Sequence, residues 1–306
     1  MTVLSVRHLT RYRYAQKVSF GEHRMMFRPR ESFDQHVLES VLTITPRPVH
    51  IRYVHDVFGN TIGIARFESR ARELVFESIN RLELHPENSL DIPRSDFAAN
   101  AWPFTYDPVD VADLAPSRAP IYPDLHGALA AWARRFLDGL TMRDAPHVLA
   151  AMTLAIHDEL VYEGRVSGPP QAPLETLAVG RGTCRDFAVL MMEAARTLGL
   201  AVRFVSGYLY VPQRDGRAIH KGGGNTHAWV RVFLPGGGWA EFDPTNGLVG
   251  NRDLIRVAVA RDPAQAVPLS GTFDGEIGDY LGMDVEVDVV AEEPGETERN
   301  RVVRMR

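Results

Sequence analysis

The first 90 residues alternate apolar and polar side chains in short runs, as strands buried on one face do. Four runs stand out: Val37–Thr45, Arg52–Val57, Thr61–Phe67 and Glu73–Leu84. The two middle runs flank Phe58-Gly59-Asn60, a hairpin turn in which Gly and Asn tolerate positive φ. No long 3.6-residue period competes with this pattern. We predict a small all-β, sandwich-like domain over residues 1–90.

Prolines then interrupt every regular pattern between Pro86 and Pro123. Such a segment is typical of a connector that runs over the surface. We therefore predict a proline-rich connector over residues 91–123, held down by its aromatic side chains.

Helical spacing of apolar residues follows the connector and predicts three helices, at Leu125–Leu140, Pro146–Val161 and Cys184–Leu198. Strand patterns come next, at Ala201–Val211, Thr226–Leu234, Gly238–Phe242 and Met283–Val290. Helices followed by a run of strands indicate an α+β domain. We assign it residues 124–290, with the helix that opens at Cys184 packed on an antiparallel sheet. Residues 291–306 form a polar tail.

Composition narrows the class of protein. The chain of 306 residues is 45% hydrophobic, which is globular, and its net charge of −5 gives no electrostatic footprint for nucleic acid or an anionic membrane. It shows no apolar run near the roughly 18 residues of a membrane helix and no signal-peptide pattern. The single cysteine excludes an intramolecular disulfide. We predict a cytoplasmic protein without membrane or nucleic-acid partners.

The one thiol, Cys184, lies in Gly-Arg-Gly-Thr-Cys-Arg-Asp-Phe. Thr183 and Asp186 have the spacing of a capping pair, which makes Cys184 the first helical residue. A helix N-terminus favours the thiolate and offers N–H groups to an oxyanion. Cysteine is also often a small buried apolar residue. From this segment alone, a nucleophile and a core residue are both open.

A thiolate nucleophile needs a base and a group that orients the base. His227 begins one predicted strand, and Asp243 ends the next, after a Pro-Gly-Gly-Gly turn. Neighbouring antiparallel strands would set the two side by side, with the free ring nitrogen facing Cys184. A surface histidine and a turn aspartate are the plain alternatives. Their joint occurrence behind a cysteine at a helix start favours a Cys-His-Asp arrangement.

These segments carry a family resemblance. GRGTCRDFAVLMMEAARTLGLAVRFVSGYLY and THAWVRVFLPGGGWAEFDPTNG resemble the core of the transglutaminase-like superfamily of cysteine enzymes, over about Leu125–Gly247. The N-terminal β region and the segment Arg261–Gly271 are similar to a bacterial subgroup classed with cysteine proteases. The resemblance implies a papain-like core, with Cys184 as nucleophile, His227 as base and acid, and Asp243 as the orienting carboxylate.

Two aromatic residues are further candidates for oxyanion or substrate-site support. The resemblance implies an aromatic donor beside the oxyanion, and Tyr162, upstream of the cysteine segment, is its counterpart; a tyrosine satisfied by a carbonyl is the alternative. Trp229 shares a strand face with His227 and is expected near the thiol. We expect no cofactor and no metal, because neither a dinucleotide fingerprint nor ligand-spaced histidines occur.

The function expected is that of a cysteine-dependent hydrolase or acyltransferase that acts on peptide or isopeptide amides through an acyl-enzyme. Hydrolysis, as in a thiol protease or amidase, is favoured. Three alternatives stay open: a protein-glutamine γ-glutamyltransferase that cross-links proteins, an arylamine-type acetyl transfer from coenzyme A, and a non-catalytic peptide-binding scaffold. The partner is a peptide or amide substrate, proteins included.

Overall fold

Two antiparallel sheets form the N-terminal β domain. The computed structural model describes residues 2–85, 101–138, 144–165, 168–214, 217–218, 221 and 223–292. The larger sheet has the order β17-β1-β6-β3, and β18 also pairs with β1. Its strands are β1 (Thr2–Phe20), β3 (Gln35–Thr45), β6 (Ala71–Leu84), β17 (Phe273–Asp274) and β18 (Tyr280–Ala291). The smaller sheet has the order β16-β2-β5-β4, with β2 (His23–Met25), β4 (His50–His55), β5 (Thr61–Arg66) and β16 (Leu269–Ser270).

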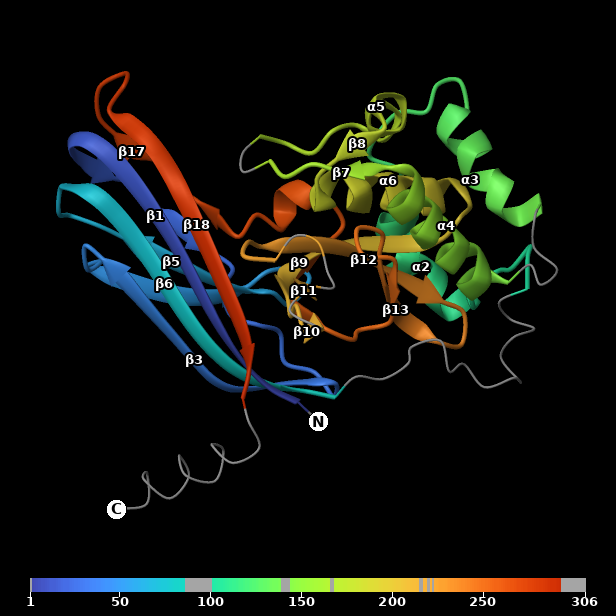
Figure 1. The fold of residues 1–306 in the computed structure, drawn as a ribbon, viewed down its shortest axis with the longest axis horizontal. Coiled ribbons are helices and arrows are strands. Elements are labelled where there is room, and N and C mark those ends of the chain that lie inside the picture. The colour runs from blue at the N-terminus through green and yellow to red at the C-terminus, as the bar shows by residue number, and fades with distance from the viewer. Residues whose placement is uncertain are drawn as a thin grey trace, which may run out of the picture.

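The long strands of the larger sheet serve two cores. Towards the end of β1, Tyr14, Val18 and Phe20 pack with residues of β2 and β6 between the two sheets. At its beginning, Leu4 and Val6 pack against the second domain. The part of the large sheet near the end of β1 therefore forms a sandwich with the smaller sheet. The part near the start of β1 packs against the second domain instead (Figure 1).

The second domain is built on a five-stranded antiparallel sheet of order β14-β13-β12-β9-β15. These strands are β9 (Ala201–Leu209), β12 (His227–Leu234), β13 (Gly238–Asp243), β14 (Leu248–Val249) and β15 (Leu254–Ala260). Smaller elements are the parallel pair β7 (Val161–Tyr162) and β8 (Arg181–Gly182), the hairpin β10 (Gln213–Arg214) and β11 (Arg217–Ala218), and the 3-10 turn η2 (Pro263–Gln265).

Helices pack around this sheet (Figure 1), and the first of them lies on the face opposite to the others, where Leu114 packs with Ala201, Phe233 and Trp239. The helices are α2 (Pro108–Arg118), α3 (Ala128–Asp138), α4 (Ala145–Glu159), α5 (Pro173–Val179) and α6 (Cys184–Thr197). Helix α6 is central, because it packs on β9 and β12 on one side and on α3, α4 and α5 on the other. Its side chains are buried nearly all round, as expected of a helix with neighbours on every side. The predicted mixed fold, a cysteine helix on an antiparallel sheet after an all-β domain, is confirmed.

The two domains share a buried interface. Tyr208, Ile255 and Val257 from β9 and β15 pack against apolar residues of β1, β6 and β18. His8 of β1 adds a polar contact, because its Nδ1 lies 2.9 Å from the Tyr208 hydroxyl and its Nε2 lies 2.9 Å from Thr10 Oγ1. The β domain is thus packed against the second domain through a buried interface.

Several elements differ from the sequence predictions. The last strand, predicted within the catalytic domain, pairs along its length with β1 of the N-terminal sheet, which local alternation does not reveal. The connector, predicted without regular structure, contains α2, because Asp107 caps a helix that starts at Pro108. Strand β15 and helix α5 were not predicted. Residues 91–100 of the connector and 293–306 of the tail lie outside the described residues.

In the described part of the chain, no helix combines the length and apolar composition that crossing a membrane requires.

Candidate active site

Cys184 is the first residue of α6, and a capping box fixes this helix start. The Thr183 side chain accepts from the Asp186 backbone N–H, and Asp186 Oδ2 accepts from the Thr183 N–H at 2.7 Å. Gly182 is required by this box, because a Cβ there would lie 2.8 Å from the Asp186 Cβ. The predicted capping pair is confirmed. The Thr183 side chain occupies the Asp186 N–H, so the N–H groups of Cys184 and Arg185 are the first-turn donors left at this helix start.

His227 and Asp243 meet across neighbouring strands. His227 opens β12 and Asp243 ends β13, and the register that pairs Val230 with Phe242 brings them to one face. His227 Nε2 lies 2.8 Å from Asp243 Oδ2, and both side chains are fully buried. Asp243 also accepts from Thr245 N at 2.9 Å and Asn246 Nδ2 at 2.8 Å. The carboxylate is thus fixed in the plane it offers to the ring.

Among the described residues, the other ring nitrogen of His227 lies free at the cavity that Cys184 also lines. Nδ1 is buried and has no hydrogen-bond partner among the described residues. The Cys184 sulfur is nevertheless close enough to act on the ring, whose protonated form it stabilises. The structure therefore brings together all three side chains that the sequence predicted.

The charges of this cluster support one another. Burial alone would lower the pKa of His227, but the Asp243 charge, the hydrogen bond to it and the Cys184 sulfur together raise that pKa to about 10. Burial would raise the pKa of Asp243, but the His227 charge and the Asn246 and Thr245 hydrogen bonds lower it. The ring is therefore an imidazolium at neutral pH, paired with a carboxylate.

Trp229 lies beside the His227 ring rather than in the open cleft. The two rings stack at 5.8 Å between centroids and 26° between planes, and Trp229 is fully buried. Gly207 makes room for the indole, because a Cβ there would lie 2.7 Å from Trp229 Cη2. Trp229 therefore contacts the candidate active-site histidine but is not among the described residues that line the cavity. Its support of the substrate site stays a prediction.

A buried ionic chain continues from Trp229 to the N-terminal domain. The indole Nε1 donates to Glu241 Oε2 at 2.8 Å, and Glu241 Oε1 accepts from Arg256 at 2.6 Å. Arg256 also donates to Asp34 in the β domain. These buried ion pairs were not predicted. The signal in the sequence was Glu241, a charged residue between the apolar Ala240 and Phe242 of β13.

Tyr162 stands at the mouth of the site. Strand β7 pairs in parallel with β8, which sets Tyr162 opposite Gly182, two residues before the thiol. Its hydroxyl has no hydrogen-bond partner among the described residues. Burial, followed by the charges of Cys184 and Asp243, raises the pKa of Tyr162 to about 12, against the opposing charge of Arg185. It is therefore a neutral O–H donor on which the charge of Cys184 acts, and its part in oxyanion or substrate-site support stays a prediction.

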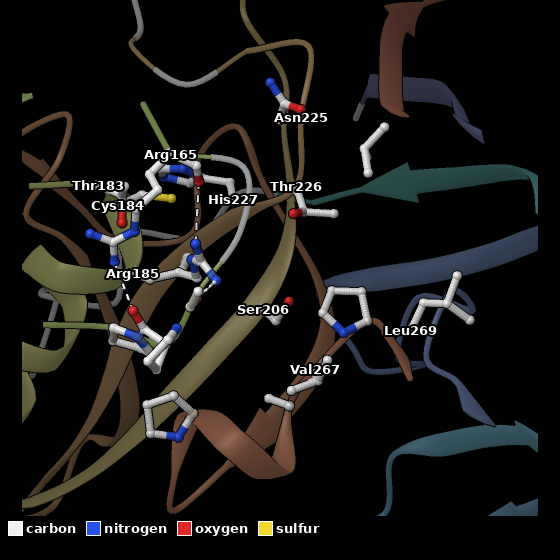
Figure 2. Close-up of a pocket in the computed structure, with 18 of the residues that line it drawn as sticks. Arg165, Thr183, Cys184, Arg185, Ser206, Asn225, Thr226, His227, Val267 and Leu269 are labelled. Carbon is white, nitrogen blue, oxygen red and sulfur yellow. Dashed lines mark hydrogen bonds between the residues drawn. The ribbon is translucent and has the colours of Figure 1, made fainter. Parts of the chain in front are cut away.

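These residues line a cavity of about 730 Å³ between the two domains. Cys184 and His227 lie on one side, with Arg165 and Arg185 (Figure 2). Tyr162 also lines the cavity. The opposite wall comes from the segment after β15 and from the large sheet: Val267, Leu269, His8, Thr10, Tyr12, Met283 and Val285. This wall was not predictable from local sequence patterns, because strands from both ends of the sequence contribute to it.

Comparison with known proteins identifies the family to which the two domains belong. Residues 131–244 match the model of the transglutaminase-like superfamily, and residues 4–83 match the bacterial transglutaminase-like N-terminal region. The uncharacterized protein ML0607 of Mycobacterium leprae is 30% identical over 289 residues, which cover 93% of this chain and 98% of that protein. This chain belongs to the transglutaminase-like superfamily. The uncharacterized protein Rv2569c of Mycobacterium tuberculosis is 28% identical over 93% of this chain and 91% of its own length.

A solved structure shares the fold of both domains. The crystal structure of "a Putative Cysteine Protease from Cytophaga hutchinsonii" matches 95% of this chain and 91% of its own, with a TM-score of 0.70 and 19% sequence identity. At this identity the likeness concerns the fold alone. The transglutaminase-like core and the preceding β domain therefore form a shared two-domain unit.

Proposed function

We propose that this chain is a cysteine-dependent hydrolase of peptide or isopeptide amides, with Cys184 as nucleophile, His227 as general acid and base, and Asp243 as the orienting carboxylate. The observation that carries the proposal is the His227 ring, held at 2.8 Å by Asp243 and lining the same cavity as a thiol at a helix start. Such a base and orienter are what an activated nucleophile requires.

In this reaction the Cys184 thiolate attacks the amide carbonyl carbon. First-turn N–H groups of α6 and the Tyr162 hydroxyl stabilise the oxyanion. The His227 imidazolium gives its proton to the leaving amine, and an acyl-enzyme remains. Neutral His227 then takes a proton from water, which attacks the acyl carbon and releases the acid together with the thiolate.

Hydrolysis is favoured over transfer to an amine. A cavity of about 730 Å³ has room for water, which needs no binding site of its own to react. Efficient transfer requires that the acceptor amine be bound and oriented beside the acyl-enzyme. Cross-linking and acetyl transfer begin with the same acylation of Cys184. The three reactions therefore differ in the molecule that takes the acyl group from the enzyme, which is water in hydrolysis and an amine in the other two.

The experiment is a screen of peptide, isopeptide and small amide substrates, with acid quenching and intact-mass detection of acyl groups on the wild-type protein and on Cys184→Ala. We expect an acyl adduct on wild type only, and free carboxylic acid as the product even with an excess of a primary amine. Amide product under the same conditions would favour cross-linking, and a stable acetyl adduct from acetyl-coenzyme A would favour acetyl transfer. Amide turnover by Cys184→Ala would overturn the proposal.

A further inference from the structure

The charged residues that line the cavity differ in how they are neutralised. Arg165 forms an ion pair with the buried Asp186 at 3.0 Å. The lining carboxylate Asp262 faces its own turn, where Oδ1 accepts from Ala264 N at 2.9 Å. Arg185 is the remaining lining arginine, and no carboxylate pairs with it among the described residues.

Arg185 is held in place by neutral groups. One terminal nitrogen donates to Gly168 O at 3.0 Å and the other to Arg165 O at 3.2 Å. These bonds use two of the five N–H groups of a guanidinium. The side chain is therefore oriented without being neutralised, and N–H groups are left for a further acceptor.

The charge of Arg185 reaches the reacting groups. The residue directly follows Cys184 in the first turn of α6, and its charge opposes the rise in the pKa of Tyr162. In Figure 2, Arg185 and Arg165 lie on the thiol side of the cavity, and Val267 and Leu269 lie on the far side. One end of the cavity is thus cationic and the other apolar.

We infer that Arg185 binds a carboxylate of the substrate, so that the amide cleaved belongs to an acidic peptide or an acidic amino-acid derivative. A planar guanidinium binds a carboxylate through paired hydrogen bonds, which fix orientation as well as charge. The apolar wall receives the rest of the substrate. This inference rests on the proposed role of Cys184 as nucleophile.

Two alkylating agents of nearly equal size test it without the natural substrate. Iodoacetate carries a carboxylate and iodoacetamide a neutral amide, so the ratio of their rates at Cys184 measures the preference for an anion. We expect Arg185→Gln to lower this ratio roughly 3- to 10-fold, as removal of one charge about 4–6 Å away does when water screens the pair. A residue that only stabilised the thiolate would change both rates equally and leave the ratio unchanged.

Arg181→Gln is the matched control. Arg181 is exposed, lies at 3.7 Å from Glu163 and does not line the cavity, so the same charge change should leave the ratio as in wild type. An equal ratio in wild type and Arg185→Gln would overturn the inference.

A measurement on the wild-type protein completes the test. N-acetylglutamate should slow the labelling of Cys184 by iodoacetamide more than N-acetylglutamine does, and equal protection would count against the carboxylate site. Slow labelling of Cys184, with the pH profile of a free thiol, would instead contradict the proposed function itself.

Discussion

His227 is the residue on which the chemistry of the site depends. Its ring is buried, which by itself opposes a charge, yet Asp243 and Cys184 stabilise the imidazolium and raise its pKa to about 10. Thr183, Asp186, His227 and Asp243 were all identified from the sequence, because a capping pair and strand ends are local signals. Asn246, Gly207 and Glu241 were not, since their contacts depend on which strands pair.

Replacing Asp243 by Asn should reverse the protonation of His227. The amide keeps the shape but removes the charge, so burial prevails and the pKa of the ring falls below its ordinary value of 6.5. A histidine NMR titration should show an imidazolium at pH 7 in wild type and a neutral ring in the variant. Turnover should fall by a factor on the order of 10⁴, as in serine-protease triads. Glu163→Gln, an exposed carboxylate, is the control, and an unchanged ring titration in Asp243→Asn would contradict the charge assignment.

Cys184→Ala should separate catalysis from folding. The change removes one sulfur atom beside a cavity, so the free energy of unfolding should change by less than about 1 kcal/mol. Acyl-enzyme formation should disappear, because Thr183 is engaged in the capping box. Urea unfolding and intact-mass analysis measure the two effects. A large loss of stability would indicate that the thiol is a core residue.

Helix α6 and strands β12 and β13 form the working unit of the domain. Their local patterns predicted them nearly to the residue, because amphipathic spacing and alternation are short-range properties. Strand β18 was also recognised as a strand, but its partner was not, since β1 lies at the opposite end of the sequence. The chain from Trp229 through Glu241 and Arg256 to Asp34 joins these elements to the β domain.

Glu241→Gln should show how strongly this buried chain holds the elements together. Glu241 is buried between Arg256 and Arg231, whose Nε lies 3.4 Å from Glu241 Oε1. Asp34 is the second carboxylate on Arg256. Loss of the Glu241 charge therefore leaves the buried Arg256 and the partly buried Arg231 with one carboxylate, and an uncompensated buried charge costs about 3–5 kcal/mol. Urea unfolding of this variant should be compared with Glu159→Gln, which breaks the half-exposed pair with Arg135 and should cost less than about 1 kcal/mol. Similar losses in the two variants would contradict a structural role for the chain.

At the scale of the whole molecule, the two domains enclose one cavity. His8 links them through Tyr208 while lining that cavity, and burial lowers its pKa to about 4. The cleft wall, like the partner of β18, was not predictable from local patterns, because it exists only once the domains have docked. The cytoplasmic location and the identity of the partners stay predictions.

The His8 contact should make the protein sensitive to acid. In the unfolded chain His8 binds a proton with the ordinary histidine pKa of 6.5. In the folded protein burial lowers the pKa of His8 to about 4. Stability from this residue is therefore complete above pH 6.5 and falls as the pH drops to 4, by about 3 kcal/mol in total. Urea unfolding of His8→Gln across this range should show a shallower pH dependence than wild type. The exposed His50→Gln should follow wild type, and parallel curves for all three would contradict the assignment.

The pairing of β18 with β1 also sets an order on synthesis. Strand β1 ends at Phe20 and its partner begins only at Tyr280, so nearly the whole chain leaves the ribosome before this edge is closed. Until then β1 carries an unpaired edge, which in a nascent chain is prone to pair with other molecules. Met283 and Val285 of β18 also line the cleft, so the thiol gains its far wall last. A newly made molecule thus lacks the part of its cleft wall formed by Met283 and Val285 until β18 has been translated.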